Sequence, residues 1–553
     1  MPETLEIKRL DQRPMTESLL AKNKVKFLGL GSDEIIKYFF SGSAWTAIIV
    51  LGLITLSLFR EGSGFFPQHH ESLKLYRMAG LEFVDIFRDQ MTAQASLSRY
   101  LNKLKLDKAL ALKNQGLSEE QITVKLASLE QLRLDLDQTG LESQAFLDEM
   151  TQSIAAIKER YTISEENKTS RQKMVDAAKL FEKSGDKEGA DALLAGLDEY
   201  PVETIDFAKE VGDLKAAYLP RHKEVTETMA VQMKALFASV STGPETGYGT
   251  ELEKFKGTVT KLTDRFPEVH QKMVAWNQNV PVPFYESLTK FIFGSKWVTQ
   301  SFWQDWYGFI PLFVGSLTVS IVALMVAVPL GVGAAIYINQ VATIQEQNFI
   351  KPYIEFIAVI PSVVLGFFGI AVLGESIRLF TQWEYMAWVP GWPISERLNI
   401  ITAGLLLALM SVPTIFTFSE DALNNVPKSY KEASFALGAN RLQTIARIMV
   451  PASLSGIISA ILLGFGRVIG ETMVVLLVAG NRLEIPNFAA GLNVIFQPVH
   501  TMTGLVAQEI PEVVKDSLQY RALFVLAIML FLISLLINYV AQIFVRKYKI
   551  SVG

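Results

Sequence analysis

Six stretches of this 553-residue chain are each apolar over roughly the 20 residues that a helix needs to cross a membrane. Half of the residues are hydrophobic, and they are clustered in these stretches rather than spread evenly along the chain. The sequence therefore predicts an all-α polytopic membrane protein. The predicted transmembrane helices lie near residues 43–60, 308–338, 354–373, 400–419, 452–480 and 522–545. The first should remain as an anchor, because the polar and charged segment 1–42 precedes it and no small-residue cleavage site follows cleanly.

Lysine and arginine are distributed unevenly between the two sides that six alternating helices would give. These residues are retained on the cytoplasmic side when they lie in short loops. One side has fifteen of them and the other, without the long segment 61–305, has five. We therefore expect both termini, including a tail over 1–42, in the cytoplasm. The fifteen are Lys8, Arg9, Arg13, Lys22, Lys24, Lys26, Lys37, Lys351, Lys428, Lys431, Arg441, Arg447, Arg546, Lys547 and Lys549, and the five are Arg378, Arg397, Arg482, Lys515 and Arg521.

The polar segment 61–305 lies outside the cytoplasm in this topology, and its pattern is helical. Ser118 and Gln121 predict a capping box, with Gly116 and Gly140 as breaks on either side of a helix. Apolar residues then recur at steps of three and four residues. They do not hold a heptad for three or four repeats, so we favour internal packing in a helical hairpin or small bundle over a signalling coiled coil. The stripe consists of Ile122, Leu126, Leu129, Leu132 and Leu136.

Aromatic residues introduce the second apolar stretch. From about residue 293 the chain carries Phe293, Trp297 and Phe309 close together. Half-buried rings of this kind suit the interface between membrane and water. The segment before residue 308 is therefore expected at the membrane surface.

The polar loop between the fourth and fifth stretches has a specific spacing. Glu432-Ala433-Ser434 is followed after three residues by Gly438, and nine residues later by Ile448, one residue and Val450-Pro451. This pattern resembles the EAA loop of bacterial ABC-importer permeases and departs from it at Ser434 and Val450. The resemblance implies that the short helix of the loop sits in a groove of an ATPase subunit and transmits its motion.

A helix of about ten residues is predicted within this loop, with Asn425 as a cap before Pro427 and Gly438 as its stop. Tyr430, Ala433 and Leu437 share one face of this helix, and Glu432 and Lys428 are spaced as an ion pair on another. Small residues let a partner's surface approach closely. An amphipathic helix lying on the lipid surface is the alternative. The predicted coupling residues are Tyr430, Glu432, Ala433, Leu437 and Gly438.

Several kinds of chemistry are excluded. The chain has no Gly-x-x-x-x-Gly-Lys-Ser/Thr motif, so it lacks the loop that cradles nucleotide phosphates, and another chain must hydrolyse ATP. It has no cysteine, which excludes disulfides and thiolate metal sites. The five histidines form no metal cluster in the sequence and are interpreted as surface or core residues: His69 and His70 are adjacent, whereas His222, His270 and His500 are isolated. The net charge of -4 is too small to suggest a nucleic-acid partner.

Arg467 and Glu471 are the strongest chemical signal, and the fifth predicted helix places Arg467 near its midpoint. A central charge costs about 2.5 to 3.5 kcal/mol on insertion scales, so both groups must face protein or water. Their spacing predicts an ion pair on one helix face. A guanidinium fits a tetrahedral oxyanion, so we predict that Arg467, Glu471 and Thr472 line a substrate path. A purely structural pair is the alternative. Pro361-Ser362 and Pro413-Thr414 interrupt the third and fourth stretches, where kinks free backbone groups that line a path or serve only as structural kinks.

At these residues the chain resembles the permeases of phosphate importers, the PstC type more than its partner PstA. The resemblance covers about 293–553 and implies an ABC type I importer permease fold (MetI-like) over 306–553, with the coupling loop at 421–451 and no cofactor. It implies a PstA-like second permease, two PstB-like ATPase subunits, a PstS-like periplasmic phosphate-binding protein and a bacterial inner membrane. The insert 61–292 departs from shorter members. The matching segments are 327–333, 360–366, 470–474 and 520–524.

Two other functions stay open. A permease of the same architecture would carry another oxyanion, such as molybdate or sulfate, and the argument from Arg467 alone does not distinguish these cargoes. A membrane sensor with a helical external domain is suggested by 61–305. That class predicts a cytoplasmic kinase, cyclase or signalling coiled coil, whereas only 546–553 follows the last apolar stretch.

Overall fold

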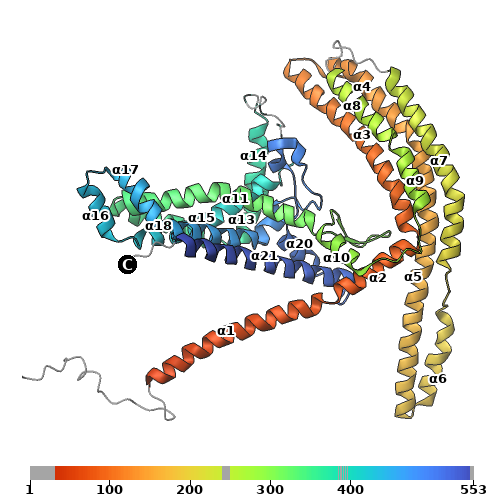
Figure 1. The fold of residues 1–553 in the computed structure, drawn as a ribbon, viewed down its shortest axis with the longest axis horizontal. Coiled ribbons are helices and arrows are strands. Elements are labelled where there is room, and N and C mark those ends of the chain that lie inside the picture. The colour runs from red at the N-terminus through yellow and green to blue at the C-terminus, as the bar shows by residue number, and fades with distance from the viewer. Residues whose placement is uncertain are drawn as a thin grey trace, which may run out of the picture.

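The computed structural model describes residues 32–239, 249–383 and 396–548, together with positions 385, 389, 392 and 394. The basic residues of the predicted tail up to Lys26, and Lys549 near the C-terminus, lie outside the described residues. The described chain is mainly helical, with one two-stranded hairpin. It forms a bundle of apolar helices and a helical insert joined to one end of that bundle (Figure 1).

Six helices in the described part of the chain are long and apolar enough to cross a membrane. This number agrees with the sequence prediction and confirms the all-α membrane class. The six spans are Phe39–Met78, Ile310–Val341, Ser362–Thr381, Ile400–Asn424, Arg441–Ile469 and Leu518–Phe544.

Two of the predicted helices have other boundaries. A helix over 354–373 is wrong at its start, because α12 (Ile344–Ile357) ends before Pro361 and a new run begins with α13 (Ser362–Phe368). Proline disfavours helical backbone in the residue before it, which explains the break. A helix over 452–480 is wrong at both ends, since the continuous run is Arg441–Ile469.

The fourth span, α15 (Ile400–Asn424), is the centre of the bundle, and 72% of its most apolar window is buried. Glycine lets its neighbour α11 (Ile310–Ile336) approach closely. A Cβ on Gly404 of α15 would lie 2.5 Å from Val322, and one on Gly331 of α11 would lie 2.9 Å from Ile415. The chain continues from α11 through the remaining elements η3 (Tyr337–Val341), η4 (Gly369–Leu373), α14 (Gly374–Thr381), α16 (Lys428–Ala436), α17 (Arg441–Thr444), η6 (Ile445–Met449), α18 (Val450–Ile469), α19 (Met473–Val478), η7 (Phe488–Phe496), α20 (Met502–Glu509) and α21 (Leu518–Tyr548).

The insert is a helical bundle with its own apolar core, as the sequence predicts. The capping box forms in α4 (Glu119–Thr139): Ser118 accepts the Gln121 N–H, and the Gln121 side chain accepts the Ser118 N–H. All five residues of the predicted stripe on α4 are buried in that core. The other elements are α2 (Phe65–Met78), α3 (Leu81–Asn114), α5 (Leu141–Ser184), α6 (Lys187–Ala195), η1 (Gly196–Glu199), α7 (Phe207–Ser239), α8 (Gly249–Thr263), α9 (Phe266–Ala275) and α10 (Phe284–Ile292).

An aromatic joint connects the insert to the bundle. The strands β1 (Trp297–Val298) and β2 (Trp306–Tyr307) pair antiparallel and lead into α11. Phe65, Phe291, Trp297 and Tyr307 form a buried core here with Leu523 of α21. The joint lies at the end of the bundle opposite α16 and α17 (Figure 1). The helix α1 (Ser32–Gly62) runs obliquely from the same joint, and its described side chains are mostly exposed.

Candidate functional site

The loop helix α16 begins and ends where the sequence suggests, with one difference. Asn425 follows the last residue of α15, and Pro427 occupies the capping position of α16, so the predicted Asn425 cap is wrong. Gly438 adopts a left-handed φ of 83° and ends the helix. Its N–H donates to the Phe435 carbonyl over 2.9 Å, and the next N–H donates to the Ser434 carbonyl over 3.2 Å. These two bonds satisfy carbonyls that the helix end leaves free.

The predicted coupling residues lie on the surface of the described chain. Tyr430, Glu432, Ala433, Leu437 and Gly438 are all exposed, and Leu437 is 89% exposed. Among the described residues, the predicted ion pair between Lys428 and Glu432 does not form. An exposed apolar residue beside a carboxylate on a short helix is available to a partner.

Two cations tie this loop to the end of α11, a link that the sequence prediction missed. Lys431 donates to the Gln340 side chain over 3.1 Å. Arg441 donates to the backbone carbonyls of Gln340 and Val341 over 3.0 and 3.4 Å. Gln340 is buried in the π turn η3, which closes α11. Ser434 of α16 is also buried and hydrogen-bonded to Thr444 of α17 over 2.9 Å, so the loop is braced internally.

The fifth span breaks at the residues predicted to line a path. The helix α18 ends at Ile469, and α19 starts at Met473. Arg467 is therefore in the last turn rather than at the midpoint. The predicted ion pair with Glu471 is wrong, because Glu471 lies beyond the helix end, where a spacing of four residues no longer stacks side chains.

Other groups take the places of that pair. The Arg467 guanidinium donates to the Thr414 hydroxyl of α15 over 2.9 Å. Glu471 accepts the Met473 N–H over 3.2 Å at the start of α19. Thr503 donates to the Glu471 carbonyl over 2.7 Å and holds the break against the first turn of α20. The sequence marks Thr414 only as part of a kink with Pro413, and it gives no signal for Thr503. Neither contact could be predicted, since each joins distant segments.

Arg467 is exposed, and Glu471 and Thr472 are half-buried. Gly466 beside them has nothing within 4 Å of a Cβ position, whereas Gly464 packs against Ile415. The arginine thus stands on an uncovered face of otherwise apolar helices. A charge on such a face is stable only if protein or water covers it.

A family model and several curated relatives match the chain. The model for the binding-protein-dependent transport system inner membrane component matches residues 327–550. The probable ABC transporter permease protein YqgH of Bacillus subtilis is 33% identical over 240 residues, which cover 43% of this chain and 72% of that protein. The phosphate transport system permease protein PstC of Haemophilus influenzae is 29% identical over 49% of this chain and 86% of its own length. PstC 1 of Mycobacterium bovis is 32% identical over 44% and 73%.

Among solved structures, a chain of the MetNI methionine ABC transporter in an inward-facing conformation aligns with 43% of this chain and 93% of its own length, at 15% identity and a TM-score of 0.32. The relatives are permease subunits rather than enzymes. The chain belongs to the family of inner membrane components of binding-protein-dependent transport systems, as a PstC-like ABC transporter permease that carries a long helical insert.

Proposed function

We propose that this chain is one permease half of an ATP-driven importer of inorganic phosphate. Its path runs past Arg467, Glu471 and Thr472, and its loop helix α16 couples the path to ATPase subunits. The names of the PstC relatives support phosphate as the cargo.

The observation that carries this proposal is the position of the Arg467 guanidinium. It projects from the last turn of α18 on an exposed face, with the Thr414 hydroxyl 2.9 Å away. A guanidinium fork and a hydroxyl are the donors that a tetrahedral oxyanion requires. The same face needs a cover in the membrane, which a PstA-like second permease would supply.

The partners on the other side follow from the loop. The exposed residues Tyr430, Glu432, Ala433 and Leu437 offer α16 to a groove of a PstB-like ATPase, and two such subunits would serve the two permeases. The chain itself lacks a nucleotide-binding loop. A PstS-like periplasmic binding protein would deliver the anion. Lys431 and Arg441 would carry the motion of the loop to α11.

The two ends of the bundle support the predicted topology. The helices α16 and α17 lie at one end, and the joint to the insert lies at the opposite end (Figure 1). With Lys428, Lys431, Arg441 and Arg447 in the cytoplasm, the insert 61–305 is periplasmic and 306–553 is the permease domain of an inner membrane protein. Both termini are then cytoplasmic.

The test is phosphate uptake by the assembled transporter with Arg467→Ala. Loss of a charged hydrogen-bond donor is worth about 1.5 to 3 kcal/mol, so uptake falls at least about tenfold. Arg467→Lys keeps the charge without the fork and restores uptake only in part. The matched control is Arg265→Ala, an exposed arginine of the insert, which leaves uptake unchanged.

Two results would contradict the proposal. Normal uptake by the Arg467→Ala transporter, with its ATPase still bound, removes the assigned role. Competition of labelled phosphate with unlabelled phosphate, sulfate and molybdate tests the cargo, and stronger competition by sulfate or molybdate than by phosphate identifies another oxyanion.

A further inference from the structure

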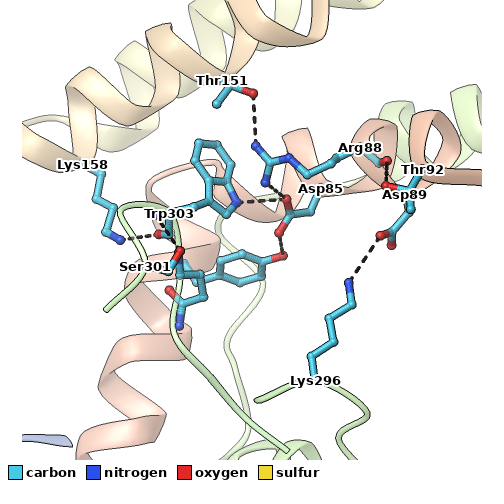
Figure 2. Close-up of polar contacts among 11 residues, drawn as sticks. Asp85, Arg88, Asp89, Thr92, Thr151, Lys158, Lys296, Ser301 and Trp303 are labelled. Carbon is cyan, nitrogen blue, oxygen red and sulfur yellow. Dashed lines mark hydrogen bonds and ion pairs between the residues drawn. The ribbon is translucent and has the colours of Figure 1, made fainter. Parts of the chain in front are cut away.

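A cavity of about 680 Å³ lies in the joint between the insert and the bundle. Its walls come from the start of α3, the end of α10 and the hairpin that precedes α11. Asp85, Arg88, Lys296 and Trp303 surround this space in Figure 2. No residue predicted from the sequence as part of the path or the coupling loop takes part in it.

One side of the cavity is a closed polar network centred on Asp85. Its carboxylate accepts the Tyr76 hydroxyl over 2.6 Å and the Trp303 indole N–H over 2.9 Å, and it pairs with Arg88. The Arg88 guanidinium carbon also lies 4.1 Å from the centroid of a Trp303 ring. Asp85 and Arg88 therefore neutralise each other (Figure 2), and this side of the cavity has no charge left for a ligand.

The other side keeps charges that are loosely held. The Lys296 ammonium is 3.9 Å from an Asp89 carboxylate oxygen, and both side chains are largely exposed. The Lys290 ammonium lies 5.7 Å from the Trp306 ring centroid, and among the described residues it has no ion-pair partner within 4.0 Å. The cavity thus has two cations for one carboxylate on this side. A phosphodiester anion complements this balance.

The cavity also lies beside the start of a membrane span. Trp306 is four residues before the start of α11, the second span. Exposed apolar side chains are frequent in the segment that carries the two lysines, and Phe293 and Val298 among them line the cavity. They are Phe284, Tyr285 and Leu288 on α10, then Phe293, Val298 and Phe302, with Phe293 72% exposed. Exposed aromatic residues mixed with lysines, next to a spanning helix, are typical of a segment that lies in the lipid interface.

We propose that this cavity binds the headgroup of a phospholipid from the outer leaflet, with the phosphodiester between Lys290 and Lys296. The exposed Phe293 and Val298, which line the cavity, lead the acyl chains from the headgroup to the bilayer. The bound lipid seals the joint where the insert meets the membrane. Free phosphate would use the lysines but not this apolar rim, and it would fill only a small part of 680 Å³.

The test uses the full-length chain, freed of lipid in detergent and titrated with short-chain phosphatidylglycerol, with bound lipid counted by native mass spectrometry. A lysine near a lipid surface contributes about 1 kcal/mol, so Lys290→Ala with Lys296→Ala weakens binding about thirty-fold. Arginine at both positions restores it. The matched control replaces the exposed Lys187 and Lys272 of the insert by alanine and leaves binding unchanged.

A second variant tests the apolar rim of the cavity separately from the two lysines. Phe293→Asp alters an exposed side chain, so the fold is retained, and it weakens the binding of phosphatidylglycerol and phosphatidylcholine alike. Equal binding by wild type and the double alanine variant overturns the proposal. So does displacement of the lipid by excess inorganic phosphate, which identifies the site as one for the free anion.

Discussion

The polar partner of Arg467 comes from a segment that is distant in the sequence. The spacing of four residues pointed to Glu471, but the helix ends at Ile469 and the guanidinium bonds Thr414 on another span. The residue types Arg, Glu and Thr could be read from the sequence as candidates for an anion path. Their pairing depends on how α15 packs against α18, which no local pattern reports.

His222 gives a residue-scale prediction about pH. It is fully buried in the insert, with its Nδ1 3.2 Å from that of His270 and its Nε2 without a hydrogen-bond partner among the described residues. The sequence prediction treated both as isolated, yet their rings stack at 5.4 Å. Burial, together with His270, lowers the pKa of His222 from 6.5 to about 4. The unfolded chain therefore binds the proton first as the pH falls.

The stability of the insert should thus be unaffected by His222 above pH 6.5 and should decrease between pH 6.5 and 4. The loss approaches about 3 kcal/mol at the lower limit. Hydrogen exchange of peptides from α3, α7 and α9 measures it. His222→Leu removes this group, so the protection factors of these peptides, corrected for the intrinsic pH dependence of exchange, fall less on acidification in the variant than in wild type. An identical pH dependence in both proteins would show that the histidine stays neutral or is solvated.

At the scale of elements, the loop helices and the π turn of α11 form one unit. Arg441→Ala removes two hydrogen bonds to the η3 carbonyls. The loop helices then remain attached to η3 mainly through the hydrogen bond of Lys431. We expect phosphate uptake by the assembled transporter to fall about tenfold, since hydrogen bonds to a charged group contribute about 1.5 to 3 kcal/mol. ATP hydrolysis should continue and lose its dependence on the binding protein.

Arg447→Ala is the control for this variant, because Arg447 is an exposed arginine of the same loop region whose side chain makes no hydrogen bond to the described residues. It should leave uptake and ATP hydrolysis unchanged. If Arg441→Ala transports normally, the loop drives α11 through other contacts.

The elements that depend on local patterns were predictable. The α4 stripe and capping box follow from spacing, and the apolar spans follow from composition. The ends of the third and fifth spans were not. The helices break at Pro361 and after Ile469, although the apolar sequence continues across both points. Hydropathy therefore does not distinguish helix from turn there. The second break is held by Thr503, more than 30 residues further on.

For the whole molecule, α11 is the helix that connects the two ends. Its start follows the hairpin that contacts the insert. At its other end, the η3 turn accepts a hydrogen bond from Arg441 of the loop helices. A movement at either end therefore reaches the other through one helix packed on α15. This arrangement makes the insert part of the moving system if its joint is rigid.

We predict that Trp303 makes this joint rigid. Its indole N–H bonds Asp85 of α3, its ring contacts Arg88, and its carbonyl accepts Lys158 of α5 (Figure 2). Trp303→Ala removes the indole, and a lost hydrogen bond to a charged group alone costs about 1.5 to 3 kcal/mol.

The distance between the insert and the bundle can be measured with two spin labels. Because the chain has no cysteine, labels attach only at the introduced residues, Val124→Cys in α4 and Val514→Cys before α21. We expect the measured distance distribution to broaden in Trp303→Ala. Phe302→Ala, which truncates the exposed neighbour, should keep it narrow. A narrow distribution in both variants would mean that the buried core around Phe65 and Trp297 holds the joint without the Asp85 network, and the insert would then follow α11 through packing alone.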